Sequence, residues 1–247
     1  MCPNVVPLRA FAGGLVFGER TGPGQPVVLT LHGWGRDRSD FASLLSGLDA
    51  VAIDLPGFGA SPPPPEAWGA HEYAEALLPV LDEFVGPALV LGHSFGGRVA
   101  VCLAAAHPER VRALVLTGVP LLRPGGVRRP PLKYRAIRSL HRAGLISVAR
   151  MERARYRYGS RDYRAASGVM RHVLVRAVNE SYERELGLIR CPVELVWGQA
   201  DAEAPLAVAK QVADMVPRAR LTILAGRDHF TAMADPQLRA ALEKHLP

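Results

Sequence analysis

Residues 88–106 read ALVLGHSFGGRVAVCLAAA, and this stretch decides the fold. Its first four residues form an apolar run that is typical of a buried β-strand, and the residues from 95 onward have a helical pattern. The glycines between them allow a sharp turn with close approach of the backbone. A strand that turns directly into a helix is half of a β–α–β unit, so the stretch predicts an α/β protein with a parallel sheet.

The rest of the chain supports this fold class. Short runs rich in Val, Ile and Leu predict five further buried strands, at residues 27–31, 50–54, 111–116, 193–197 and 221–224. Helical patterns lie at residues 40–48, 71–84, 206–215 and 237–245. Helices cover both faces of a parallel sheet, and its central strands are therefore continuously apolar, as these runs are. We expect a single α/β domain over residues 1–247.

The turn at residues 92–96, GHSFG, has the pattern G-x-S-x-G. Between a strand and a helix, this pattern strains the serine backbone and projects the hydroxyl outward, which predicts Ser94 as a nucleophile. The alternative is a glycine-rich turn that binds phosphate at a helix N-terminus. No Walker lysine follows and no acidic ribose-binding pattern is present, so we expect no nucleotide or other cofactor.

A serine hydroxyl needs a base to remove its proton as it attacks, and histidine is the usual base. His229 follows the last predicted strand, in a loop before the final helix, and such a loop can reach Ser94. The other histidines have simpler interpretations. Five are expected on helix surfaces, namely His71, His107, His141, His172 and His245. His32 and His93 lie in glycine turns and are expected to hydrogen-bond the backbone.

A carboxylate from another loop at the same sheet edge must orient the base and stabilise its positive charge. Asp201 follows the strand at residues 193–197 and fits this role, with a helix cap as its alternative interpretation. Glu203 is a rival for the role, whereas Asp228 is adjacent to His229 and should point elsewhere. Stabilisation of an oxyanion needs hydrogen-bond donors, and we expect the backbone N–H groups of Trp34 and Phe95 to supply them.

Five motifs together resemble the α/β-hydrolase superfamily over nearly the whole chain. They are HGWG at 32–35, DLPGFG at 54–59, GHSFGG at 92–97, WGQAD at 197–201 and GRDHF at 226–230. The resemblance implies an eight-stranded, mostly parallel sheet, a triad in the order Ser94, Asp201, His229, and a cap inserted after the sixth strand. One departure is Arg227-Asp228 before the histidine, where relatives often have glycine, and this puts the loop conformation in doubt.

The nucleophile restricts the reaction. Similar folds that act on haloalkanes or epoxides use an aspartate, so a serine favours hydrolysis of a carboxylic ester. Thioester, amide and C–C bond hydrolysis and cofactor-free perhydrolysis use similar triads and stay open. A non-catalytic binding module is the alternative from another class of function, although the apparent triad is complete. The natural substrate and the oligomeric state depend on pocket and surface shape rather than on any motif.

Residues 121–187, which we call the cap, interrupt the alternation of strands and helices. After a Pro- and Gly-rich start, apolar residues recur there at helical spacing, namely Ile137, Leu140, Leu145, Ile146, Val148, Val169, Met170, Val173, Leu174 and Val178. We expect helices whose apolar face covers the active site. The cap has 16 Lys and Arg against 5 Asp and Glu, a net charge of +11, and the remainder has −4. This charge fits a solvated surface or attraction of an anionic acyl substrate or carrier better than binding to a membrane or nucleic acid.

The compartment follows from what the sequence lacks. Residues 1–20 contain no apolar run that could serve in a signal peptide, and no stretch approaches the roughly 20 apolar residues that span a bilayer. We therefore expect no stable membrane insertion. Cys2, Cys102 and Cys191 are odd in number and lack CxxC spacing, which argues against a disulfide framework or a metal site. These features favour the cytoplasm. The partner that the serine nucleophile predicts is a small-molecule acyl substrate.

Overall fold

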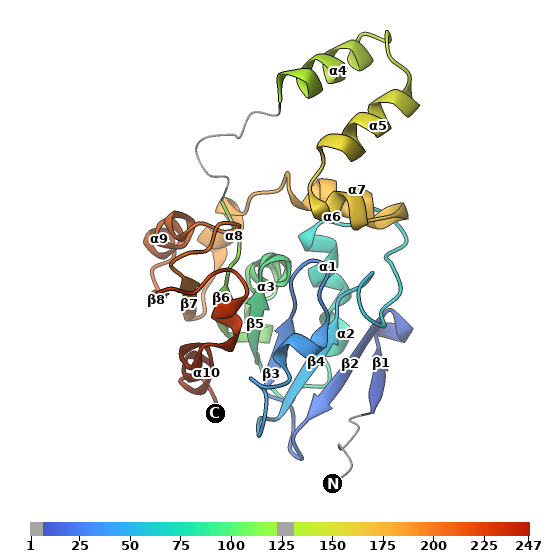
Figure 1. Cartoon of the computed structure of the whole chain (residues 1–247). Helices are drawn as coiled ribbons and strands as arrows, with labels where there is room; N and C mark the ends of the chain where they lie inside the picture. Colours follow the sequence, from blue (N-terminus) through green and yellow to red (C-terminus); the bar gives the residue numbers. More distant parts are fainter. Residues whose placement is uncertain (1–6, 123–130) are drawn as a thin grey trace.

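A computed structural model, which describes residues 7–122 and 131–247, contains one eight-stranded sheet flanked by helices (Figure 1). The strands are β1 (Leu8–Phe11), β2 (Val16–Thr21), β3 (Val28–Leu31), β4 (Ala50–Asp54), β5 (Ala88–His93), β6 (Val111–Thr117), β7 (Val193–Gly198) and β8 (Ala219–Leu224). Their order across the sheet is β1-β2-β4-β3-β5-β6-β7-β8. The pairs β1–β2 and β2–β4 are antiparallel and the others parallel. The predicted eight-stranded, mostly parallel sheet is confirmed.

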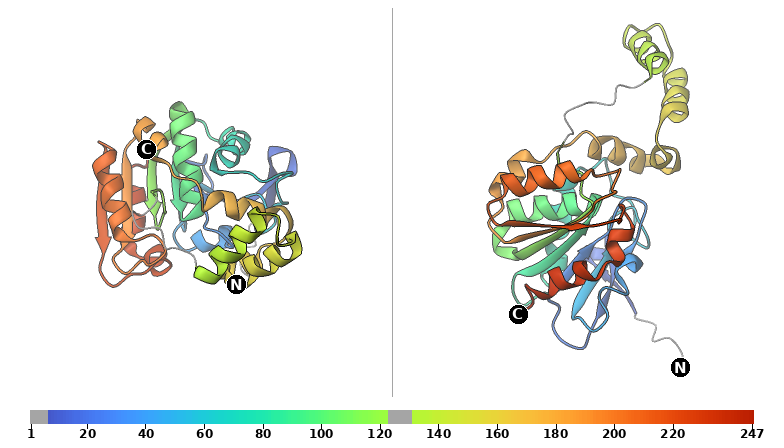
Figure 2. Two further views of the ribbon diagram at one scale, coloured as in Figure 1. Left: turned by 90° about the horizontal axis from the view of Figure 1, so that it is seen from above. Right: turned by 60° about the vertical axis from the view of Figure 1, so that its left-hand side comes forward.

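Helices cover both faces of this sheet, as the right-hand view of Figure 2 shows. Those outside the cap are α1 (Ala70–Ala76), α2 (Leu78–Leu81), α3 (Phe95–Ala106), α9 (Leu206–Met215) and α10 (Pro236–Glu243). Two apolar clusters result, one on each side of the sheet, and α3 is buried in the larger of them. The aligned carboxyl ends of β5, β7 and β8 therefore present their loops at one sheet edge.

Two predicted helices differ from the structure. The helix expected at residues 71–84 is divided between α1 and α2, where Pro79 cannot donate a backbone hydrogen bond to the preceding turn. The prediction of a helix at residues 40–48 is wrong. A 3₁₀ turn (Arg38–Phe41) is followed there by tight turns, such as Leu48 N to Leu45 O at 2.9 Å. These turns still bury four apolar side chains, so the pattern identified the buried face but not the local conformation.

Between β6 and β7, the described residues form five helices and their connections. These are α4 (Leu132–Arg142), α5 (Val148–Tyr158), α6 (Arg161–Ala165), α7 (Gly168–Ala177) and α8 (Glu183–Leu188). The Pro and Gly residues with which the cap was expected to begin, at 124–126 and 130, lie outside the described residues. Val173 and Ala177 of α7 and Leu186 of α8 are buried, so these two helices pack on the body of the protein.

Helices α4 and α5 form a hairpin that stands away from the sheet (Figures 1 and 2). Leu140, Leu145 and Val148 are 43%, 73% and 67% exposed, so the expectation that their apolar face covers the active site is wrong. The helices pack against each other instead, through Met151 and Ala154 on α5. An amphipathic pattern indicates that a helix has an apolar face, and does not specify what that face contacts.

Candidate active site

Ser94 lies at the turn from β5 into α3, in an unusual backbone conformation. Its φ is 51° and its ψ is −114°, and it is one of two non-glycine residues with positive φ among those the structure describes. Glycine is required both before and after Ser94, at residues 92 and 96. A Cβ on Gly92 would lie 2.5 Å from the Cα of Gly97, and one on Gly96 would lie 2.2 Å from the carbonyl oxygen of Leu31. The backbone at Ser94 is therefore strained and tightly enclosed, as the motif predicts.

Asp201 and His229 meet at the same sheet edge. Asp201 lies after β7, His229 lies after β8, and the Nδ1 atom of His229 is 2.8 Å from Oδ2 of Asp201. Both side chains are buried. The other carboxylate oxygen accepts hydrogen bonds from the backbone N–H groups of Glu203 at 2.9 Å and Ala204 at 2.8 Å. Because the carboxylate can only accept, Nδ1 carries the proton and Nε2 is left with a free lone pair.

The imidazole of His229 lies beside the strand end that holds Ser94. The backbone N–H of Ser94 donates to the carbonyl of Thr117 at 3.1 Å. A Cβ on the next residue, Gly118, would lie 2.9 Å from Nδ1 of His229. Gly118 has a φ of +60°, and this close approach to the imidazole requires glycine there. The turn after β6 thus helps to place the base. The sequence analysis did not predict this role, although the glycine that directly follows the predicted strand was a signal for it.

A second carboxylate lies near Nε2 of His229. Oε2 of Glu203 lies 3.4 Å from Nε2 of His229, and the Glu203 side chain is 61% exposed. Within residues 7–122 and 131–247, no hydrogen bond joins Ser94 to His229. Asp201 therefore takes the position at Nδ1, and Glu203, its predicted rival, lies on the opposite side of the ring. An exposed carboxylate at this distance can move away at little cost.

The two histidines of the glycine turns bond to the backbone, as predicted. Nδ1 of His32 donates to the carbonyl of Gly33 at 2.8 Å, while its Nε2 accepts from the N–H of Leu55 at 2.9 Å. Burial lowers the pKa of His32, which keeps it neutral in this pattern. Nε2 of His93 donates to the carbonyl of His229 at 3.1 Å. Both turns at the sheet edge are thus fixed by side chains.

The two turns that carry the backbone amides predicted for the oxyanion contact each other. Phe95 is the first residue of α3, where a backbone N–H has no partner within the helix. The side chains of Trp34 and Phe95 meet edge to face with ring centroids 5.5 Å apart, and Phe58 contacts both. The Gly96 N–H donates to the carbonyl of His32 at 3.0 Å, which joins the turn of Trp34 to the start of α3. The role of the Trp34 and Phe95 amides at the oxyanion stays a prediction.

The loop before the base is ordered by its own side chains. Oδ1 of Asp228 accepts from the N–H groups of Phe230 at 3.1 Å and Thr231 at 2.8 Å, so Asp228 points away from the imidazole, as predicted. Arg227 pairs with Asp235 at 3.0 Å. Arg227 and Asp228 therefore both help to order this loop.

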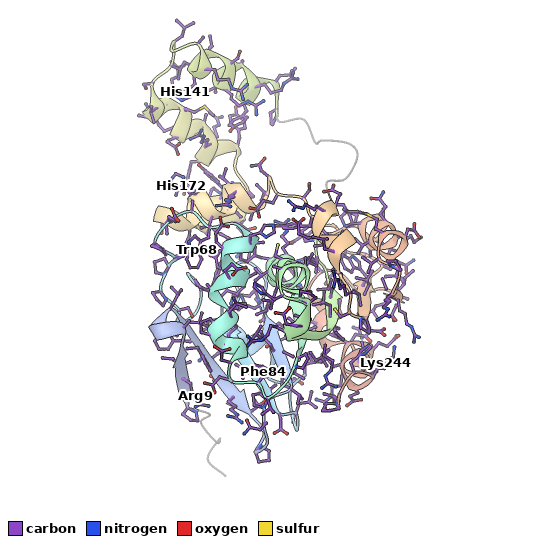
Figure 3. All side chains as sticks on the ribbon, turned by 180° about the vertical axis from the view of Figure 1, so that it is seen from behind. Arg9, Trp68, Phe84, His141, His172 and Lys244 are labelled. Carbon is purple, nitrogen blue, oxygen red and sulfur yellow. The ribbon has the colours of Figure 1, made fainter. Side chains whose placement is uncertain are left out.

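Three of the five remaining histidines lie within helices. His141 lies on the projecting hairpin and His172 on α7, as the labelled side chains show (Figure 3). His71 pairs with Glu185 at 3.1 Å on the surface of α1. The prediction that these are helix-surface residues is confirmed for all three.

The two cysteines that the structure describes are free. Burial raises the pKa of the Cys102 thiol, and it raises the pKa of Cys191 to about 11. Both are therefore neutral and weakly reactive at pH 7. Among the described residues, no group of three or more His, Cys, Asp and Glu could hold a metal ion. No helix in this part of the chain has the length and apolarity needed to cross a membrane.

A strained serine between β5 and α3, with a buried histidine–carboxylate pair on the loops after β8 and β7, is the arrangement of an α/β-type hydrolase. Comparison with known proteins agrees. The model of the alpha/beta hydrolase family matches residues 28–242, and the chain belongs to that family. The protein is thus a hydrolase.

Curated relatives and solved structures extend this comparison. The chain is 30% identical over 251 residues to a pimeloyl-(acyl-carrier protein) methyl ester esterase of Aromatoleum aromaticum, covering 88% of this chain and 96% of the relative. It is 28% identical over 246 residues to a 2-hydroxy-6-oxononadienedioate/2-hydroxy-6-oxononatrienedioate hydrolase of Cupriavidus pinatubonensis, with 85% and 82% covered. A thermophilic esterase from Thermogutta terrifontis has the same fold, with a TM-score of 0.68, 21% identity, and 93% and 92% covered.

Proposed function

We propose that this protein hydrolyses carboxylic esters through an acyl-enzyme intermediate on Ser94. His229 acts as the base and Asp201 orients it. The observation that carries the proposal is the buried hydrogen bond of 2.8 Å between Asp201 and His229, beside a serine with a φ of 51°. This bond fixes the tautomer in which Nε2 can accept a proton.

Each step of the reaction has a residue to perform it. Nε2 of His229 removes the proton of Ser94 as Oγ attacks the ester carbonyl, and the N–H groups of Trp34 and Phe95 stabilise the oxyanion. The alcohol leaves with the proton from His229. Water then loses a proton to His229 and attacks the acyl group, which releases the acid and restores Ser94.

Glu203 must move for this reaction to begin. Its carboxylate lies 3.4 Å from Nε2, where the proton of the serine has to arrive. We therefore expect removal of this carboxylate to favour the reactive state.

The proposal is tested by hydrolysis of p-nitrophenyl esters from acetate to decanoate. The Ser94→Ala variant should lose activity by at least ~10⁴-fold, because removal of the nucleophile leaves only the oxyanion stabilisation and binding. Ser46→Ala, at an exposed serine, is the matched control and should keep full activity. Equal activity of the wild type and Ser94→Ala would refute the proposal. Thioester, amide and C–C substrates in the same assay distinguish the other reactions of this nucleophile.

A second, finer proposal is that the substrate is anionic or is carried by an acidic partner that binds the α4–α5 hairpin. These two helices contain eight Arg and Lys and one Glu. A hollow of about 510 Å³ between them is lined by Ile137, Ala154 and Tyr158 together with three arginines, Arg150, Arg153 and Arg157. Apolar contacts surrounded by positive charge suit an acidic surface that carries an acyl chain. The relatives named as esterases of an acyl-carrier protein ester support this proposal.

Replacing Arg150, Arg153 and Arg157 together by Glu tests the second proposal. The reversal should lower kcat/KM for a carrier-bound methyl ester at least tenfold at low salt, because charge complementarity sets the rate of encounter. The activity on p-nitrophenyl acetate should stay within twofold, since this neutral ester needs no docking surface. Equal losses on both substrates, or a loss that salt does not affect, would contradict it.

The proposal also includes a cytoplasmic location. Cys102 and Cys191 are free, which is the state that a reducing compartment maintains. We expect the enzyme to meet its small acyl substrate in the cytoplasm.

A further inference from the structure

His93 directly precedes the nucleophile and contacts the loop of the base. It is the last residue of β5, it is 1% exposed, and its Nε2 atom lies 3.1 Å from the carbonyl oxygen of His229. The two imidazole rings have centroids 4.8 Å apart and are tilted by 49°. This residue therefore connects the turn that holds Ser94 with the loop that holds its base.

The chemical state of His93 suits this connection. Burial, with a smaller contribution from His229, lowers the pKa of His93 to about 4. The ring is therefore neutral at pH 7 and has one N–H group. A carbonyl oxygen can only accept a hydrogen bond, so Nε2 carries that proton. Among the described residues Nδ1 has no partner, and a Cβ on Gly33 would lie 2.9 Å from it.

The hydrogen bond from His93 to the His229 carbonyl joins two loops that come from separate strands. Strands β6 and β7 lie between β5, which leads to Ser94, and β8, which leads to His229. Asp201, which follows β7, holds the imidazole of His229 through Nδ1. His93 holds the backbone of the same residue from the side of Ser94. The two contacts together set where Nε2 lies relative to the nucleophile.

We infer that His93 is a positioning residue, whose N–H group holds the main chain of His229 so that the base can reach Ser94. The inference rests on the proposed function, because it assigns His93 a task only if these two residues react together. A misplacement of about 1 Å in such a pair can cost ~10²-fold in rate, although His93 itself touches no reacting atom.

Three substitutions separate this role from simple packing. His93→Gln places an amide N–H near the position of Nε2 and keeps the donor, whereas the shorter side chain of His93→Asn places its amide near Nδ1. His93→Leu has no donor. We expect the Leu and Asn variants to lower kcat for p-nitrophenyl acetate by about 10- to 100-fold with KM changed less than twofold. We expect the Gln variant to stay within about threefold of the wild type.

A fluorophosphonate probe and thermal unfolding complete the test. The rate of probe reaction should fall with kcat in the Leu and Asn variants and recover in Gln, because both reactions need His229 to activate the serine. Equal losses in all three variants would overturn the inference in favour of packing, and unchanged kcat in Asn and Leu would overturn it outright. If the Leu variant does not fold, the comparison of Asn with Gln decides. A wild type that neither reacts with the probe nor hydrolyses esters would refute the proposed function itself.

Discussion

Replacing Asp201 by asparagine should trap His229 in the wrong tautomer while the fold stays intact. The Oδ1 atom of Asp201 accepts two backbone N–H groups, from Glu203 and Ala204, at 2.9 and 2.8 Å. The amide oxygen of asparagine should keep this position, which turns its NH₂ group toward Nδ1 of His229. Nδ1 must then accept, so the ring proton moves to Nε2.

The structure predicts a large loss in rate because Nε2 can no longer act as a base. In a Ser–His–Asp triad this substitution lowers kcat by ~10⁴-fold, equivalent to about 5.5 kcal/mol in the activation free energy. Glu203 should reinforce the effect. Its carboxylate is 3.4 Å from Nε2 and would accept a hydrogen bond from the Nε2–H group, which stabilises the inactive tautomer.

The assay is hydrolysis of p-nitrophenyl acetate at pH 7.5, with thermal unfolding followed by circular dichroism. Asp228→Asn is the matched control, because Asp228 is adjacent to His229 but points away from its ring. It should keep kcat within about threefold. If Asp201→Asn folds normally and keeps more than about a tenth of the activity, the assignment of Asp201 as the orienting carboxylate is refuted.

Three further results are expected. Glu203→Gln should raise kcat/KM for p-nitrophenyl acetate about twofold or more over the wild type, because it removes the charged carboxylate that lies 3.4 Å from Nε2 of His229; an equal or lower value would count against this. Gly92→Ala should destabilise the fold by about 1–3 kcal/mol in denaturant unfolding and reduce activity more than 10²-fold, since its Cβ would lie 2.5 Å from the Cα of Gly97; wild-type values would contradict the turn geometry. Cys191 should react with iodoacetamide about tenfold faster per pH unit between pH 7 and 10, because its pKa of about 11 leaves the thiolate fraction rising over that range; a plateau below pH 9 in peptide mass spectrometry would be inconsistent with this pKa.

The central strands could be predicted from the sequence because burial on both faces makes them continuously apolar. Strands β1 and β2 could not be predicted in this way, and only the family resemblance implied them. They lie at the antiparallel edge, where Leu8 is 44% exposed and the four residues of β1 include only one buried side chain, Phe11. Their pairing depends on partners distant in sequence rather than on a local pattern.

The candidate site was predicted from motif positions, and its geometry was only partly predictable. Loops after parallel strands meet at one edge, so the sequence could bring Asp201 and His229 together. It could not decide what Glu203 does, because two carboxylates two residues apart can reach opposite sides of one imidazole. The sequence also predicted a backbone hydrogen bond for His93, but not that its partner is His229.

Glycine turns and strand ends follow from local chemistry, whereas the position of the α4–α5 hairpin does not. The apolar pattern of Leu140 and Val148 would be the same whether these side chains faced the sheet, a partner or water. Their exposure becomes visible only in the structure.

The most direct measurement is the site of covalent modification by a fluorophosphonate probe, read by intact mass and then by peptide mapping. The proposed chemistry predicts one adduct per chain, located on Ser94 and not formed when the protein is unfolded with acid before the probe is added. A folded protein that hydrolyses esters but carries the adduct on another residue, or carries none, would contradict it.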